Sequence, residues 1–148
     1  MTVQVYSPSD IIFTFGGYVL ENWDTISVKK TTPTYKIVKG IRGKNTRVRS
    51  QNTAAEITVT LPITSVANAV FGEVVAQDEI YGTGRLVVTI KDVQGFEVFS
   101  STEAYVANPA DKEYGPEMSS RTWTIHCLSS NSSMSDNTVL ASIFDLIF

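Results

Sequence analysis

The chain has 148 residues, of which 43% are hydrophobic and 18% are charged, and its formal net charge is -3. This length fits one domain, and because an average soluble domain has about 25% charged residues, the low charged fraction indicates a surface partly covered by partners. The composition excludes an internal disulfide, since Cys127 is the only cysteine, and no apolar run reaches the roughly 18 residues of a membrane span. The N-terminus has no basic start before an apolar run, so we do not expect a signal peptide.

The first part of the chain is predicted to form short strands. Residues 11–15 and 18–20 are apolar segments separated by Gly16 and Gly17, which is the pattern of a β-hairpin with a two-residue turn. Apolar and polar residues then alternate with the period of two that is typical of strands. These further strands are expected at residues 25–29, 35–39 and 56–61.

Residues 40–53 are predicted to be an extended basic loop. The segment contains two glycines and few aliphatic residues, so it has little to bury. A loop of this length inside a compact domain is usually functional or disordered. The cations in and next to it are the candidate partner-binding residues of the chain: Lys39, Arg42, Lys44, Arg47 and Arg49.

A helix is predicted over residues 65–77, after the strand that Pro62 ends. Ser65 can cap its N-terminus. Its expected apolar stripe recurs at spacings of three and four residues and consists of Val66, Ala69, Val70 and Val74. Strands are expected to follow at residues 86–90, 96–99 and 103–107.

The clearest strand of the sequence covers residues 119–128. Its apolar residues alternate with polar ones, which predicts a central strand with one face on the core. Residues 129–133 are expected to be a polar linker, and Asp136 can cap a last helix. That helix is predicted to dock on its own domain or on a neighbouring subunit, because exposed apolar patches favour aggregation. Its docking residues are Leu140, Ile143, Phe144 and Ile147.

No arrangement of residues indicates catalysis. His126 and Cys127 are adjacent on a strand, so their side chains point to opposite faces and cannot form a nucleophile and base pair. A zinc site would need further cysteines or histidines, which the chain lacks, and no phosphate-binding loop is present. We therefore expect no enzymatic activity, no cofactor and no metal.

These elements together predict a mainly β fold. We expect a single domain over residues 1–148, built as an antiparallel β-sandwich or partly closed barrel. One α-helix flanks it, the basic loop extends from it over 40–53, and a linker and short C-terminal helix follow over 129–148.

Charge is distributed unevenly along the chain. Eight of the twelve basic residues lie between positions 25 and 55, where there is no Asp or Glu, whereas residues 56–148 hold twelve acidic and four basic residues. Such asymmetry suits binding to a polyanion, or binding between copies of the chain arranged head to tail. Solvated charge without any partner is the remaining alternative.

One block of the sequence carries a family resemblance. Residues 107–117 (ANPADKEYGPE), followed by residues 120–127 (SRTWTIHC), resemble a block near the end of the tail tube proteins of contractile-tailed bacteriophages, in particular the phiTE-like tube proteins. Three other features occur in the order expected for this family. They are the hairpin at Gly16 and Gly17, the loop over 40–52, and the strand and helix start over 57–65.

The resemblance implies a structural protein of the virion. Such proteins form six-membered rings whose strands join into a continuous inner barrel, and the rings stack into a tube inside a contractile sheath. The implied partners are other copies of the chain, the tail sheath protein, and tape-measure and baseplate proteins. DNA would pass through the lumen without specific binding, no membrane is involved, and assembly would occur in the host cytoplasm. The basic residues would then lie between rings, and the candidate lumen residues are Thr58, Thr60, Thr122, Thr124 and His126.

Two alternatives stay open. The same fold would serve as the ring or tube protein of a bacterial contractile injection system. A β-sandwich module that binds carbohydrate or nucleic acid would instead use exposed aromatic residues as stacking platforms. Its candidate residues are Tyr18, Trp23, Tyr35 and Tyr81.

Overall fold

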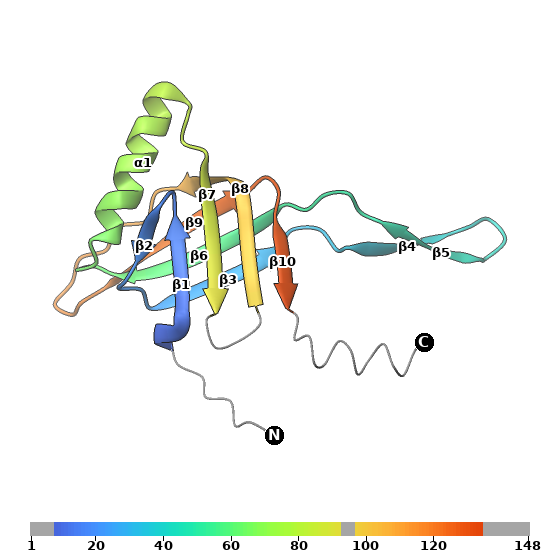
Figure 1. Cartoon of the computed structure of the whole chain (residues 1–148), viewed down its shortest axis with the longest axis horizontal. Helices are drawn as coiled ribbons and strands as arrows, with labels where there is room; N and C mark the ends of the chain where they lie inside the picture. Colours follow the sequence, from blue (N-terminus) through green and yellow to red (C-terminus); the bar gives the residue numbers. More distant parts are fainter. Residues whose placement is uncertain (1–7, 93–96, 135–148) are drawn as a thin grey trace, which may run out of the picture.

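A computed structural model describes residues 8–92 and 97–134 of the chain. Within these ranges the chain is mainly antiparallel β-structure with one α-helix, which confirms the predicted fold class (Figure 1). No helix in these ranges is long and apolar enough to cross a membrane. The predicted C-terminal helix lies outside the described residues.

The elements follow one another in a simple order. They are a short 3-10 helix η1 (Pro8–Asp10), then β1 (Ile11–Phe15), β2 (Tyr18–Leu20), β3 (Thr25–Lys30), β4 (Tyr35–Lys39), β5 (Asn45–Arg49), β6 (Ala55–Pro62), α1 (Ala67–Tyr81), β7 (Leu86–Asp92), β8 (Glu97–Asn108), β9 (Ser120–Cys127) and β10 (Asn131–Met134). The main sheet has the order β2-β1-β7-β8-β9-β6-β3, with β10 paired to β8, while β4 and β5 form a separate two-stranded sheet. The strand over 119–128 is therefore central, as predicted.

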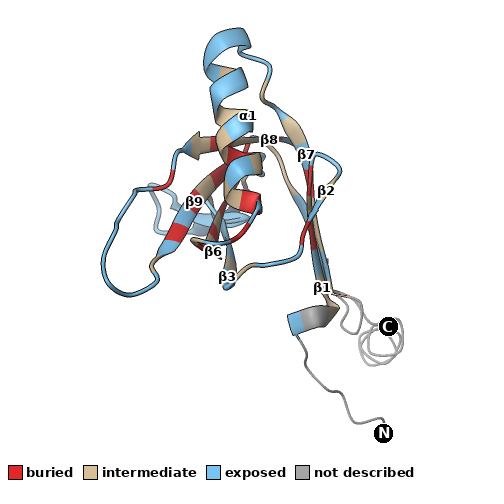
Figure 2. Cartoon of the chain, turned by 90° about the vertical axis from the view of Figure 1, so that its left-hand side faces the viewer, coloured by how far each residue is buried: buried red, intermediate tan, exposed pale blue. Residues whose placement is uncertain are grey.

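The long strand β8 divides the main sheet into two halves. Its first residues pair with β7 on one side and with β10 on the other, and its last residues pair with β9. One half consists of β2, β1, β7, β10 and the first part of β8, and the other consists of the last part of β8 with β9, β6 and β3. The two halves face each other with the buried residues between them (Figure 2). This is a β-sandwich and not a closed barrel, since β2 and β3, the two ends of the strand order, do not pair with each other.

Side-chain hydrogen bonds hold the bend in β8. The ladder between β7 and β8 shifts register where Val88 pairs with Ser101 and Leu86 pairs with Ala104. The buried Ser101 hydroxyl donates to the carbonyl oxygen of Ser129 and accepts from the backbone nitrogen of Glu103. This hydroxyl thus links β8 to the segment between β9 and β10 at the point where the ladder is interrupted.

The core lies between the two halves and takes the apolar face of each strand. The largest of the fully buried side chains are Phe13, Phe15, Ile57, Val59, Leu61, Phe71, Val88, Ile125 and Cys127. In β6 and β9 these residues alternate with half-exposed polar ones, as the sequence predicted. The predicted hairpin turn is also confirmed, because Gly16 and Gly17 both have positive φ values, of 59° and 89°.

Helix α1 begins later than predicted, but the Ser65 hydroxyl does cap its first backbone N–H group, from the position before the N-cap. Its N-cap residue is Val66, which makes no side-chain capping bond. The Ser65 hydroxyl instead accepts from the backbone nitrogen of Ala67 at 3.3 Å and donates to the carbonyl oxygen of Asn22 at 2.9 Å. Ser65 therefore ties the helix entry to the segment before β3.

The predicted apolar stripe of α1 is correct only in part, since Val74 packs against the core and Val70 is half-buried. Ala67 and Phe71 form the buried face, whereas Val66 is 70% exposed and Ala69 is exposed. The Phe71 ring centroid lies 5.3 Å from that of Phe15 and 5.5 Å from that of Trp123. Burying this large aromatic side chain removes more apolar area from water than burying valines, so it decides which face turns inward.

Two segments expected to be irregular contain strands. Residues 45–49, inside the predicted loop over 40–53, form β5 and pair with β4. Residues 131–134, overlapping the predicted polar linker over 129–133, form β10 and pair with residues 97–100 of β8. Neither strand could be recognised from the sequence, because residues 45–49 (NTRVR) and 131–134 (NSSM) do not alternate apolar with polar residues.

Candidate assembly surfaces

The sheet half made of β8, β9, β6 and β3 presents a polar face on the side away from the core. Small hydroxyl side chains form two rows across it, Thr25–Thr60–Thr122 and Ser27–Thr58–Thr124. The hydroxyl oxygens of Thr60 and Thr122 lie 3.5 Å apart. The candidate lumen residues on β6 and β9 thus share one face, and its threonine rows carry no charge.

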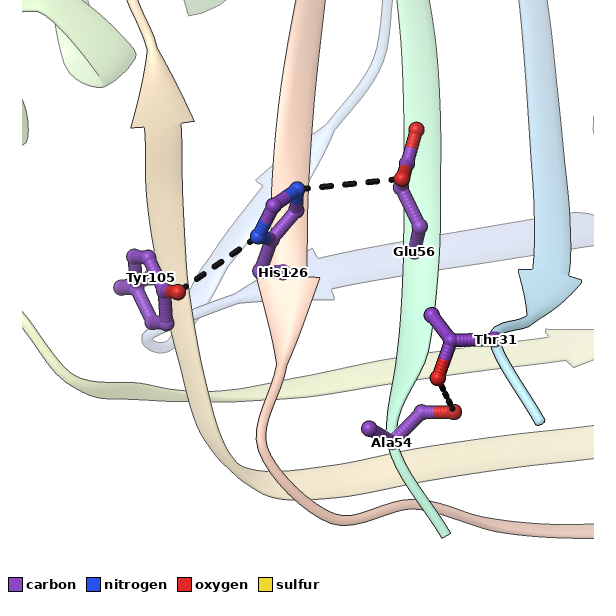
Figure 3. A network of polar contacts seen from close by, with 5 residues as sticks. All are labelled: Thr31, Ala54, Glu56, Tyr105 and His126. Atoms are coloured by element: carbon purple, nitrogen blue, oxygen red, sulfur yellow. Dashed lines mark hydrogen bonds and ion pairs between the residues drawn. The ribbon is translucent and has the colours of Figure 1, made fainter. Parts of the chain in front are cut away.

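A third row on this face joins three strands through the only histidine. His126 Nε2 lies 3.7 Å from Glu56 Oε2, and His126 Nδ1 lies 3.4 Å from the Tyr105 hydroxyl oxygen (Figure 3). The His126 and Glu56 side chains are 43% and 44% exposed, so water screens their interaction. The described residues contain no group of three or more potential metal ligands.

Cys127 points into the core, on the opposite face of β9 from His126, as predicted. Burial raises the pKa of the Cys127 thiol, and a hydrogen bond with Ser101 lowers it in part. A thiol in this setting stays protonated at neutral pH and is a poor nucleophile. The geometry therefore offers no cysteine and histidine pair for catalysis.

Residues 31–54 form a hairpin that leaves the body of the molecule, and we call it the arm (Figure 1). Its base continues the β3–β6 pair. There, Thr31 donates to the Ala54 carbonyl oxygen from both its backbone nitrogen and its hydroxyl, at 3.2 and 3.1 Å. Asn52 donates to the Thr32 hydroxyl at 3.0 Å. These bonds fix the direction in which the arm leaves the sandwich.

The arm is basic and exposed along its length. All residues of β4 and β5 are exposed, including Ile37, which is 75% exposed. The register places Ile37 opposite Arg47 and Tyr35 opposite Arg49, so these four side chains share one face, and the Arg47 guanidinium lies 4.3 Å from the Tyr35 ring centroid. Of the predicted partner-binding residues, Lys39, Arg47 and Arg49 are on this face. Arg42 and Lys44 lie in the turn at its tip.

The opposite end of the β3–β6 pair is acidic. There the backbone nitrogen of Asp24 donates to the Thr60 carbonyl oxygen at 2.8 Å, and the Ser120 hydroxyl lies 3.3 Å from the Asp24 carboxylate. This brings the segment before β3 beside the segment before β9. The exposed acids of these two segments, which we call the acidic end, are Glu21, Asp24, Asp111, Glu113 and Glu117. The sequence alone does not reveal this cluster, because its members come from segments about 90 positions apart.

Other predicted site residues are not brought together. Tyr18 and Trp23 pack against the core, Tyr35 is on the arm, and Tyr81 ends α1, so these aromatic residues do not line one groove. The predicted docking residues of the C-terminal helix lie outside the described residues, namely Leu140, Ile143, Phe144 and Ile147.

The sequence is similar to that of a phage structural protein. Structural protein ORF10 of Pseudomonas phage KPP10 is 29% identical over 122 residues, which cover 81% of this chain and 69% of that protein. No family model matches the chain.

The fold is shared with chains of contractile injection systems. One comes from the cryo-EM structure of the anti-feeding prophage cap (AFP tube terminating cap), with a TM-score of 0.65, 14% identity, and coverage of 91% of this chain and 95% of that one. Another comes from the PVC sheath/tube terminator of an extracellular contractile injection system in the extended state, with a TM-score of 0.63, 10% identity, and coverage of 90% and 99%. A third comes from the PVC sheath-tube complex, with a TM-score of 0.59, 10% identity, and coverage of 87% and 91%. At such identities the likeness establishes the fold alone.

Proposed function

We propose that the chain is a structural component of a contractile phage tail, and that its copies bind one another head to tail. The protein is not an enzyme, which agrees with its similarity to the structural protein of phage KPP10. The single observation that carries the proposal is the polarity of the β3–β6 pair, which has the basic arm at one end and the acidic end at the other.

Head-to-tail contact between copies would give a partner surface to both ends of the β3–β6 pair, the basic arm and the acidic end. A two-stranded hairpin by itself is at best marginally stable in water, so the arm needs a partner surface. Each exposed ion pair contributes only about 0 to 1 kcal/mol, but a repeated interface multiplies this small term. A contact between different surfaces that does not close on itself produces an open filament.

In its more specific form, the proposal is a tail tube protein of the phiTE-like kind. Rings, which we expect to be hexameric, would stack through the arm, with the sheath outside and tape-measure and baseplate proteins at the ends. Strands β2 and β3 have edges without a partner among the described residues, and such edges favour pairing between subunits. The polar face would line the lumen, since its threonine rows carry no cations to bind phosphates strongly and would let DNA slide. The protein would then be a virion protein, assembled in the host cytoplasm.

Electron microscopy of the purified chain tests the proposal. We expect tubes with a central channel at low salt and fewer at high salt, because salt screens exposed charges. The double variant Arg47→Glu with Arg49→Glu should remain folded and form no stacks. A matched control, Arg85→Glu with Lys91→Glu, makes the same change of charge at exposed sites off the arm and should assemble normally. Dispersed monomers of the unaltered chain under all conditions would contradict the proposal.

A contractile injection system is the second candidate, and the shared fold favours it. The same surfaces would serve its tube, so the two candidates differ in the assembly that the tube enters. The presence or absence of DNA in the assembled particles distinguishes them.

A further inference from the structure

A groove of about 460 Å³ lies between α1 and the segment that follows β8. Its helix wall includes Ala69, Gly72 and Val75, and its other wall includes Pro109 and Lys112. The lining also includes Arg121 and Trp123 of β9 and is mostly apolar, and it contains no acidic residue. The groove belongs to neither the arm nor the polar face.

Arg121 gives this groove a buried positive charge. The residue is only 7% exposed, and its Nη1 donates to the Ser119 hydroxyl at 3.0 Å and to the carbonyl oxygens of Glu113 and Ser120 at 3.3 and 3.4 Å. The Tyr114 ring centroid lies 5.2 Å from the guanidinium carbon. Among the described residues Arg121 makes no ion pair, although buried charges are costly unless an opposite charge accompanies them. The groove therefore favours an occupant that is both apolar and acidic.

Gly72 keeps the helix wall of the groove open. A glycine inside a helix is destabilising relative to alanine. A Cβ atom at this position would meet nothing within 4 Å, so packing within the described residues does not require glycine. An occupant that approaches the helix backbone closely would require it.

We propose that this groove is the docking site for residues 135–148 of a second copy of the chain. This segment holds two acidic residues, Asp136 and Asp145, no Lys or Arg, and the apolar set Leu140, Ile143, Phe144 and Ile147. Its charge complements Arg121 and Lys112. The arm is excluded as occupant by its own positive charge, and residues 1–7 carry no acidic side chain to pair with Arg121. The inference rests on the proposed self-assembly.

The length of β8 favours a second copy over the same chain. Met134 pairs with Glu97 at the start of β8, whereas Pro109 of the groove follows Asn108 at its end. Measured along the strand, this path is roughly 36 Å, at ~3.3 Å per residue, and it is an upper bound on the straight-line distance because β8 bends. A helix over residues 136–148, as the sequence predicts, would be only about 20 Å long. A neighbouring copy can place such a helix in the groove without unwinding it.

Filling the groove tests the docking site without harming the fold. In the full chain, Gly72→Leu should reduce assembly about tenfold in a sedimentation assay, while the midpoint of urea unfolding stays equal or rises, because leucine favours a helix over glycine. The control Gln77→Leu adds a leucine on another, exposed face of α1 and should assemble normally. Assembly of Gly72→Leu as efficient as that of the control would overturn the proposal.

Cross-linking tests the occupant. In a Cys127→Ser background, full chains with Ala69→Cys are mixed with full chains carrying Ile143→Cys and oxidised. We expect a disulfide-linked dimer at a yield about tenfold above that of a Gln77→Cys and Ile143→Cys mixture. An internal cross-link in dilute double-variant chains would show that each copy fills its own groove and would overturn the second-copy assignment. Tubes without the cross-link would refute the docking but leave the proposed function standing. Cross-linked dimers that never form tubes would support the docking and contradict the proposed function.

Discussion

The Trp123 indole nitrogen Nε1 donates a hydrogen bond to Asn68 Oδ1 at 2.9 Å, and this bond ties the central strand β9 to helix α1. The same Asn68 side chain donates to the carbonyl oxygens of Pro62 and Ser65, at 2.8 and 3.2 Å. One amide thus connects the end of β6, the start of α1 and the core face of β9. The position of the helix wall of the groove depends on this connection.

We expect Asn68→Leu to lower the free energy of unfolding by about 1–3 kcal/mol, because it leaves the buried indole nitrogen without its acceptor. The carbonyl oxygens of Pro62 and Ser65 lose one hydrogen bond each but keep the backbone nitrogens of Ser65 and Asn68 as donors. Urea unfolding followed by Trp fluorescence measures the change. Gln77→Leu is the control, since the Gln77 side chain is exposed and, within the described part of the chain, hydrogen-bonds only Glu73, at 3.4 Å. A loss no larger than that of the control would show that water replaces the Asn68 bonds.

Phe71→Ala should be among the most destabilising substitutions in the chain. The Phe71 side chain is fully buried between Phe15 and Trp123, so its removal leaves a cavity that costs about 3–5 kcal/mol. Calorimetry or urea unfolding measures this loss. Val66→Ala, at the exposed N-cap of the same helix, should stay within about 0.5 kcal/mol of the unaltered chain. Equal effects of the two substitutions would contradict the assigned buried face of α1.

A charge swap tests whether the arm contacts the acidic end of another copy. One variant carries Arg47→Glu and Arg49→Glu, and the other carries Glu21→Lys and Asp24→Lys. If these residues face one another between copies, each variant alone brings like charges together at the altered positions and should assemble poorly. An equimolar mixture should assemble, because opposite charges then meet at these positions. Light scattering follows assembly. A mixture that scatters no more than its components would place the partner surface of the arm elsewhere.

The buried thiol predicts a dependence of stability on pH. Burial raises the folded-state pKa of Cys127 above its ordinary value of 9.0. The contribution of this shift is therefore fully present below pH 9 and is lost as the pH rises through the folded-state pKa. The unaltered chain should lose more stability than Cys127→Ala as the pH is raised above 9, measured by urea unfolding. Parallel curves for the two chains would contradict this.

The same thiol should be chemically inert in the folded chain. Iodoacetamide should label Cys127 slowly at neutral pH and rapidly in urea, and Cys127→Ser should still assemble. Failure of Cys127→Ser to assemble, with its unfolding curve unchanged, would reveal a role for the thiol that its burial does not explain.

Much of the strand structure could be read from the sequence. The alternation of Ile57, Val59 and Leu61, and of Trp123, Ile125 and Cys127, predicted buried faces that the structure confirms. Local periodicity is sufficient here because successive side chains of a strand point to opposite faces wherever the strand lies. The paired glycines of the first hairpin were informative for a similar reason, since the turn itself demands their backbone conformation.

Features that depend on distant contacts were decided by the tertiary structure alone. The inward face of α1 was set by the position of Phe15 and Trp123 and not by the valine spacing within the helix. Strands β5 and β10 exist because β4 and β8 offer free backbone groups, which side-chain patterns do not report. The acidic end and the Arg121 groove join segments far apart in the sequence, so only the packing of the sandwich brings their charges together.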